Sequence, residues 1–145
     1  MLVLNLVWVF DPAGETVLMC KRHKEPYQGL YNLLGGKVDT GEDRYAAANR
    51  ELEEESSIKT VDLKQGLHHL LDFTYYGVEY KGVKEDWLIE VYVGKLSIPL
   101  DVAGDEKELV WMSVKENFFD MTKFAGEGNI GHIYEQIKLN PCLME

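Results

Sequence analysis

Cysteine is scarce in this chain: Cys20 and Cys142 are the only two among 145 residues. Two cysteines so far apart make neither a disulfide framework nor the paired cysteines of a metal knuckle. We therefore expect a protein of a reduced, cytoplasmic setting.

Basic residues are also few, with 15 Lys and Arg against 25 Asp and Glu and a net charge of -10. General affinity for a nucleic-acid backbone depends on clustered Lys and Arg that neutralise phosphates. The charge therefore argues against a nucleic-acid polymer as partner. A small phosphate-bearing substrate would have to bind through metal ions and local cations.

A long hydrophobic segment is missing. Met1 to Phe10 is apolar, but it has no basic leader or small-residue cleavage site, and the turn sequence Asp11 to Gly14 ends it. Ten residues are too few to span a bilayer as a helix. We expect no membrane partner and interpret the segment as a strand.

The chain length fits one domain. Its 145 residues with 46% hydrophobic content are enough for one core and too few for two, so residues 1–145 are predicted to form a single domain. Whether that domain is a monomer or a homodimer stays open.

The predicted order of elements is that of an α/β protein with a mixed sheet between helices. Residues Gly77 to Lys84 are expected to form a turn region. Helices are predicted from about Asp43 to Ser56 and from Asn129 to Leu139. The predicted strands are Leu2 to Phe10, Thr16 to Arg22, Tyr31 to Leu34, Val61 to Tyr76, Trp87 to Leu96 and Leu109 to Ser113.

Three glutamates on the first predicted helix form an acidic stripe. Glu51, Glu54 and Glu55 fall within an arc of roughly 100°, whereas Glu53 points elsewhere. Three carboxylates on one stripe repel one another unless a cation lies between them, and hard oxygen ligands suit Mg2+ or Mn2+. The alternative is a solvated, Glu-rich helix face.

The context of this helix favours the metal over the solvated face. Tyr45, Ala48 and Leu52 form an adjoining apolar stripe that can be buried while the acidic stripe faces a cleft. Arg50 lies four residues before Glu54 and can brace it.

The start of the helix carries its own signals. Thr40 and Asp43 have capping-box spacing. Glu42 and Asp43 lie near the favourable N-terminal end of the helix dipole. Gly35-Gly36 precedes this start and supplies a turn after an apolar segment.

The segment Gly36 to Ile58 reads Gly-x5-Glu-x7-Arg-Glu-Leu-x-Glu-Glu-x-Ser-Ile, which resembles the Nudix box of MutT-like pyrophosphohydrolases. One fixed position differs, because the family has glycine where this chain has Ser57. A left-handed residue often closes a helix there, and serine adopts that conformation at a cost of about 1 kcal/mol. The resemblance implies an α/β/α sandwich with a mixed sheet.

The resemblance also implies hydrolysis of a nucleoside diphosphate linked to another group, with water attacking a phosphorus atom. Mg2+ is the implied cofactor, with Mn2+ as its substitute. Glu54 and Glu55 are the first candidate ligands, with Arg50 in a supporting catalytic role. Glu51 is a further ligand candidate, and the general base stays open among the three glutamates.

Two more metal ligands follow from the resemblance. The backbone carbonyl of Gly36 is one, because a residue without Cβ allows close approach. Glu106, in the acidic pair Asp105-Glu106, resembles the acid that the family supplies from outside the box. The alternative for Glu106 is an acidic loop near a turn.

Three cations could hold phosphate. Lys21 and Arg22 end the second predicted strand, and Lys37 follows the glycine turn. Arg offers a bidentate fork and Lys a point charge, although a basic residue at a strand end is often only solvated. Lys37 is favoured because it lies inside the box.

The base of the nucleotide substrate is assigned through Asn32. The run Tyr31 to Lys37 resembles MutT homologues that cleanse oxidised purine nucleotides, where an asparagine reads the base edge. An amide offers both donor and acceptor, whereas the alternative is an Asn that holds a turn. Phe124 and Glu127 are expected in the same pocket. The resulting hypothesis is hydrolysis of 8-oxo-dGTP to the monophosphate and pyrophosphate.

Competing substrates leave weaker marks. Some ADP-ribose hydrolases carry a proline shortly after the box, and this chain has none between Pro26 and Pro99. Tyr75 and Tyr76 lie near a tyrosine of some dinucleoside polyphosphate hydrolases, although aromatic residues in a strand often only pack. A module that binds a nucleotide without turnover is another alternative, and the intact set of glutamates argues against it.

Overall fold

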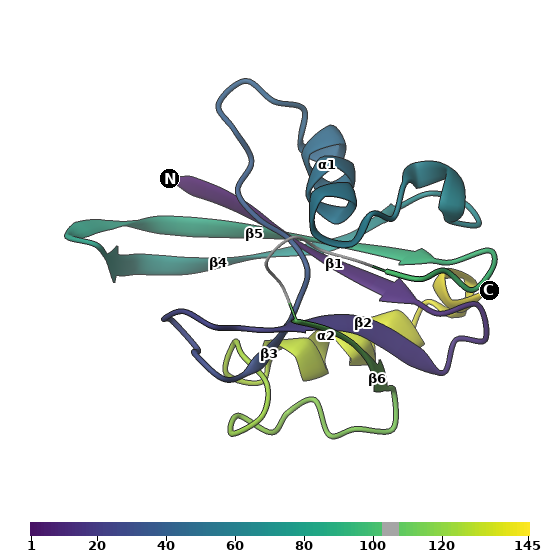
Figure 1. Cartoon of the computed structure of the whole chain (residues 1–145). Coiled ribbons are helices and arrows are strands. Elements are labelled where there is room, and N and C mark those ends of the chain that lie inside the picture. Colours follow the sequence, from purple (N-terminus) through teal and green to yellow (C-terminus); the bar gives the residue numbers. More distant parts are fainter. Residues whose placement is uncertain (103–107) are drawn as a thin grey trace.

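The computed structural model describes residues 1–102 and 108–145. A mixed sheet lies between helices α1 and α2, one on each face (Figure 1), and this confirms the α/β/α sandwich. The strands are β1 (Leu2–Phe10), β2 (Thr16–Lys21), β3 (Tyr31–Leu33), β4 (His68–Tyr80), β5 (Val83–Lys95) and β6 (Glu108–Ser113). The helices are α1 (Arg44–Ser56), α2 (Asn129–Lys138) and the short 3-10 segments η1 (Thr60–Asp62) and η2 (Pro141–Met144).

The sheet contains a split that positions the glycine turn. Its strand order is β3-β2-β1-β5-β4, with β6 also paired to β2, and only β1 and β5 run parallel. The predicted hairpin between β1 and β2 exists, but its pairing is confined to Phe10 and Val17. Near its start, β1 instead pairs with the segment that follows β3. Val7 N donates to Leu34 O at 2.7 Å, and Asn5 N donates to Gly36 O at 2.9 Å.

The predicted extent of the turn region, Gly77 to Lys84, is wrong. Strands β4 and β5 continue through most of it as a long hairpin that projects from the sandwich (Figure 1). Only Lys81 and Gly82 form the turn, with φ of 51° and 78°. Positive φ at both central residues matches the twist of a two-residue hairpin turn. The glycine at position 82 was therefore a better signal for the turn than the length of the polar stretch.

The start expected for the fourth strand is also wrong. The chain forms η1 near Val61, and β4 begins only at His68. Leu63 and Leu67 are buried under the sheet with 5% and 4% exposure, so the apolar residues there fill the core rather than extend the strand.

Alternation along β1 divides the core between the two helices. Trp8 and Phe10 pack on the α2 side with Ile130 and Ile133. Val7 and Val9 pack on the α1 side with Leu52. Successive strand residues face opposite sides of the sheet, and the sheet is therefore buried on both faces. Within the described residues, none of the helices is both long and apolar enough to cross a membrane.

Helix α1 ends where the sequence predicts. Ser57 is left-handed, with φ of 69°, and its N–H donates to Glu53 O at 2.8 Å. The N-cap residue of α1 is Asp43, whose carboxylate accepts from Ala46 N at 2.9 Å. The predicted capping box between Thr40 and Asp43 is therefore wrong. The short side chain of Asp43 reaches the first turn directly.

The buried stripe of α1 differs slightly from the prediction. Ala47, Ala48 and Leu52 are fully buried, whereas Tyr45 is 42% exposed and contacts the edge of the Tyr92 ring. Tyr45 therefore lies at the rim of the helix interface. The face of α1 that carries the three glutamates does not pack into the core.

Candidate active site

The glycine turn lies directly against the Glu51 side chain. A Cβ atom on Gly36 would fall 2.4 Å from Glu51 Cδ, and one on Gly35 would fall 2.0 Å from the Asn5 carbonyl oxygen. Such distances leave no room for a side chain at either position. The Gly36 backbone therefore lies directly against the Glu51 side chain, and the role of its carbonyl as a metal ligand stays a prediction.

Asn5 holds this turn in place. Its side-chain Oδ1 accepts from Gly36 N at 3.0 Å, and its backbone N donates to Gly36 O at 2.9 Å. Asn5 is 1% exposed. Asn5 was not predicted as a site residue, although a lone amide inside the apolar run Leu2 to Phe10 was a signal for it.

Arg50 connects the acidic stripe with the loop that precedes α1. Its Nε and Nη2 donate to the two carboxylate oxygens of Glu42 at 2.7 and 2.9 Å, and Nη2 also donates to Lys37 O at 3.1 Å. Its Nη1 donates to Glu51 Oε1 at 3.0 Å and to Glu54 Oε2 at 3.2 Å. The predicted brace between Arg50 and Glu54 is therefore present.

These contacts change the protonation behaviour of both partners. The hydrogen bond to Glu42 raises the pKa of Arg50 above its usual range. The hydrogen bond from Arg50, with a second from Asp39 N, lowers the pKa of Glu42. Both groups stay charged near neutral pH, so the fork between them persists.

The three glutamates differ in exposure. The Glu51 side chain is 14% exposed and Glu54 58%. Glu55 Oε2 accepts from Gly35 N at 3.4 Å. Glu51 and Glu54 thus contact the Arg50 guanidinium, and Glu55 contacts the glycine turn. Oxygen donors of this kind suit a hard divalent cation.

A cavity of about 300 Å³ adjoins the glycine turn. Residues of β1, β3, β4 and β5 line it, together with Gly35 and Gly36. Its walls are rich in aromatic rings, with polar groups at a few points. The aromatic lining residues are Tyr27, Phe73, Tyr75, Tyr80 and Trp87, and the polar ones are Asn5, Arg22, Asn32 and Asn129.

Asn32 and Arg22 both line this cavity, as a substrate-binding role requires. Asn32 Oδ1 accepts from Leu33 N at 2.9 Å, which fixes the amide orientation with the NH2 group as the remaining donor. Arg22 Nε donates to Pro26 O at 2.6 Å. Lys21 and Lys37 are not among the described residues around the cavity; Lys21 ends β2, and Lys37 lines a second hollow with Glu42.

Glu127 is not among the described residues that line the cavity, but it contacts Tyr27, which does line it. Tyr27 O–H contacts both Glu127 carboxylate oxygens, at 2.7 and 2.6 Å. Burial and this hydrogen bond raise the pKa of Tyr27. Tyr75 forms a hydrogen bond with Asn129, and burial raises the pKa of the Tyr75 phenol. Both phenols therefore stay neutral over the physiological range.

Phe124 and Tyr76 were also singled out from the sequence, and neither joins this site. Phe124 is 1% exposed in the core beside Phe118, so its ring does not face the cavity where stacking was expected. Tyr76 is 81% exposed on the projecting hairpin. Glu106 lies outside the described residues.

Comparisons with known proteins cover most of the chain. The family model described as NUDIX domain matches residues 3–133. An RNA pyrophosphohydrolase of Pelagibacter ubique is 38% identical over 76 residues, covering 47% of this chain and 48% of the relative. One of Caulobacter vibrioides is 28% identical over 109 residues, covering 69% and 62%. The chain thus spans about half to six-tenths of the length of these relatives.

Solved structures share the fold at low identity. A Caenorhabditis elegans Ap4A hydrolase in a binary complex has a TM-score of 0.74 at 23% identity, covering 98% of each chain. A MutT protein of Methanosarcina mazei Go1 has a TM-score of 0.72 at 19% identity, covering 96% and 94%. The NUDIX domain of Shewanella oneidensis NrtR with ADP ribose has 0.67 at 16%, covering 97% and 88%.

Proposed function

Because this chain belongs to the NUDIX domain family, we propose that it is a pyrophosphohydrolase that cleaves a phosphoric anhydride in a nucleotide. The observation that carries the proposal is the position of the Glu51 carboxylate, packed against Gly36 at the edge of the aromatic cavity. Glu54 and Glu55 lie on the same helix face. A nucleoside in the cavity would have its phosphates near these carboxylates.

The acidic stripe suits a divalent metal, with Mg2+ first and Mn2+ as substitute. Glu51, Glu54, Glu55 and the Gly36 carbonyl would hold it, with Glu106 as a further candidate. When bound, Mg2+ neutralises phosphate oxygens and lowers the pKa of a coordinated water. The exposed Glu54 carboxylate faces solvent, from which both metal and phosphate would enter.

The protein's own residues then supply placement and proton transfer. Arg50 fixes the carboxylates of Glu51 and Glu54 relative to the loop that carries Lys37. A carboxylate held in this way can orient a water for attack on phosphorus and accept its proton. The role of general base belongs to Glu51, Glu54 or Glu55. Lys37 and Arg22 are the candidate phosphate contacts.

The first candidate substrate is an oxidised purine nucleoside triphosphate such as 8-oxo-dGTP, with nucleoside monophosphate and pyrophosphate as products. Its support is Asn32, whose amide lines the cavity among aromatic rings. These rings offer stacking surfaces, and the free NH2 of Asn32 can donate to a keto oxygen of the base. Such a role would place the protein in nucleotide-pool sanitation.

A dinucleoside polyphosphate is the second candidate. Tyr75 lies in the cavity wall, and the fold matches that of an Ap4A hydrolase over nearly the whole chain. A second base could stack on the ring of Tyr27, which lines the cavity. The names of the curated relatives add RNA as a substrate to test, although the net charge of -10 opposes polymer binding.

A substrate panel tests the proposal. The protein with Mg2+ is incubated with 8-oxo-dGTP, ordinary dNTPs, diadenosine polyphosphates, ADP-ribose and a 5′-triphosphorylated oligonucleotide, and the products are separated. Preference for 8-oxo-dGTP with release of pyrophosphate would support the first candidate. Preference for another substrate would replace it while retaining the hydrolase. Absence of turnover with every substrate would favour a nucleotide-binding module.

A further inference from the structure

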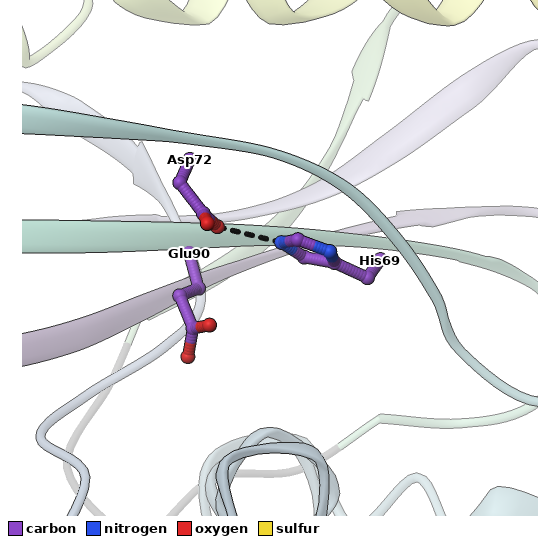
Figure 2. A group of neighbouring side chains, drawn as sticks. All are labelled: His69, Asp72 and Glu90. Atoms are coloured by element: carbon purple, nitrogen blue, oxygen red, sulfur yellow. Dashed lines mark hydrogen bonds and ion pairs between the residues drawn. The ribbon is translucent and has the colours of Figure 1, made fainter.

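His69, Asp72 and Glu90 form an edge cluster away from the acidic stripe (Figure 2). His69 and Asp72 lie on β4, the last strand of the sheet, and Glu90 lies on the neighbouring β5. One ligand atom from each residue lies within 4.8 Å of the others. His69 Nε2 and Asp72 Oδ1 are 2.6 Å apart.

An irregularity in the hairpin creates this convergence. In a regular strand, residues three apart face opposite sides of the sheet. The register between β4 and β5 shifts between His69 and Leu71, so that His69 pairs with Tyr92 while Asp72 pairs with Glu90. A bulge of this kind redirects a side chain. The bulge brings His69 to the side of the sheet occupied by Asp72 and Glu90. The centroids of the His69 and Tyr92 rings are 5.3 Å apart.

Glu90 has an unused ligand atom. The residue is 5% exposed, and its Oε1 is buried without a hydrogen-bond partner among the described residues. Its Oε2 is 3.4 Å from Arg44 Nη1, a long contact to a side chain that is 49% exposed. A buried carboxylate oxygen without a partner carries a desolvation penalty. A cation within the cluster would remove that penalty.

We propose that the edge cluster is a binding site for a transition-metal cation, with Zn2+ as the best fit. An imidazole nitrogen with two carboxylate oxygens is a common zinc ligand set, whereas Mg2+ prefers oxygen alone. Two carboxylates balance the charge of the ion. Three protein ligands leave a coordination position for water, and the bound ion would tie the edge strand β4 to β5.

The site is distinct from the acidic stripe. Arg44 and Glu51 are separated by about 10 Å along α1, from a rise of 1.5 Å per residue. Arg44 contacts Glu90 in the edge cluster, and Glu51 contacts Gly36 at the glycine turn. Metal selectivity should differ accordingly, because only the edge cluster contains a histidine. The proposal therefore stands whether or not the protein hydrolyses nucleotides.

The test is a Zn2+ titration in excess Mg2+, followed by calorimetry and by the 15N resonances of the histidine rings. The Glu54→Gln variant serves as the parent, so that the acidic stripe contributes less to binding. We expect one Zn2+ per chain and a large shift of His69 Nε2. His69→Gln and Asp72→Asn should each weaken binding by about 10-fold or more.

His68→Gln is the matched control. His68 adjoins His69 but pairs with Val93, which packs on the α2 side of the sheet. It should bind Zn2+ as the parent does. Parental affinity in both His69→Gln and Asp72→Asn, or a titration that leaves the His69 ring resonances unchanged, would overturn the proposal. The circular dichroism spectrum of each variant verifies that it is folded.

Discussion

Glu51 occupies the space that a side chain on residue 36 would need: a Cβ on Gly36 would fall 2.4 Å from Glu51 Cδ. Gly36→Ala must therefore displace the Glu51 carboxylate or the turn itself. A misplacement of about 1 Å at a catalytic group can lower the rate by about 100-fold. We expect kcat to fall by that order while the far-UV spectrum stays native. An unchanged kcat would show that the contact between Gly36 and Glu51 has no catalytic importance.

The pair Glu42 and Arg50 predicts a pH dependence of stability. Hydrogen bonds from Arg50 and the backbone hold the pKa of Glu42 below its ordinary value of 4.5. A lowered folded-state pKa contributes stability above pH 4.5, which is lost as the pH falls through the folded value.

Glu42→Gln should therefore lower Tm at pH 7, and the difference from the natural protein should shrink below pH 4.5. Thermal melts across this range measure the effect. Glu53→Gln removes the same charge from the exposed side of α1 and is the control. An equal and parallel Tm difference in both variants would contradict the role of the Arg50 contact.

Asn32 permits a substitution that separates its two hydrogen-bonding groups. Asn32→Asp keeps the oxygen that accepts from Leu33 N and removes the NH2 donor. If the donor contacts the base, preference for 8-oxo-dGTP over dGTP should fall by about 10-fold, whereas metal-dependent hydrolysis persists. The ratio of kcat/KM values measures this. An identical ratio in both proteins would exclude base recognition by Asn32.

Ser57 predicts a stabilising substitution. Its φ of 69° is a conformation that glycine adopts without a Cβ penalty. Ser57→Gly should raise the free energy of unfolding by about 0.5–1 kcal/mol. Ser57→Ala removes the hydroxyl without relieving the backbone and should not stabilise. Urea unfolding distinguishes the two, and equal stabilities would show that the left-handed position carries no strain.

Local rules predicted the elements whose signals lie within a few residues. Strand β1 matches its predicted bounds, and Ser57 is left-handed as its position in the box predicts. The long hairpin was missed because positive φ at Lys81 and Gly82 confines the turn to two residues, whereas composition suggested a wider loop.

Site contacts between residues close in sequence were likewise predictable, and those between distant residues were not. Contacts along α1, such as Arg50 with Glu54, follow from helical spacing. Asn5 lies 31 residues before Gly36, and only the tertiary fold joins them. The burial of Phe124 depends on the packing of Phe118, which no short motif encodes. The edge cluster likewise needs the register shift in β4.

The central claim is that the acidic stripe on α1 binds the metal for hydrolysis. Initial rates with Mg2+, on the substrate that the panel selects, compare Glu54→Gln with Glu53→Gln. Both substitutions remove one charge from α1. Of these two residues, Glu54 is the one that belongs to the acidic stripe and contacts Arg50. We predict that Glu54→Gln folds and loses about 100-fold or more in kcat, while Glu53→Gln stays near the natural rate. A natural rate in Glu54→Gln, or an equal loss in both variants, would contradict the account.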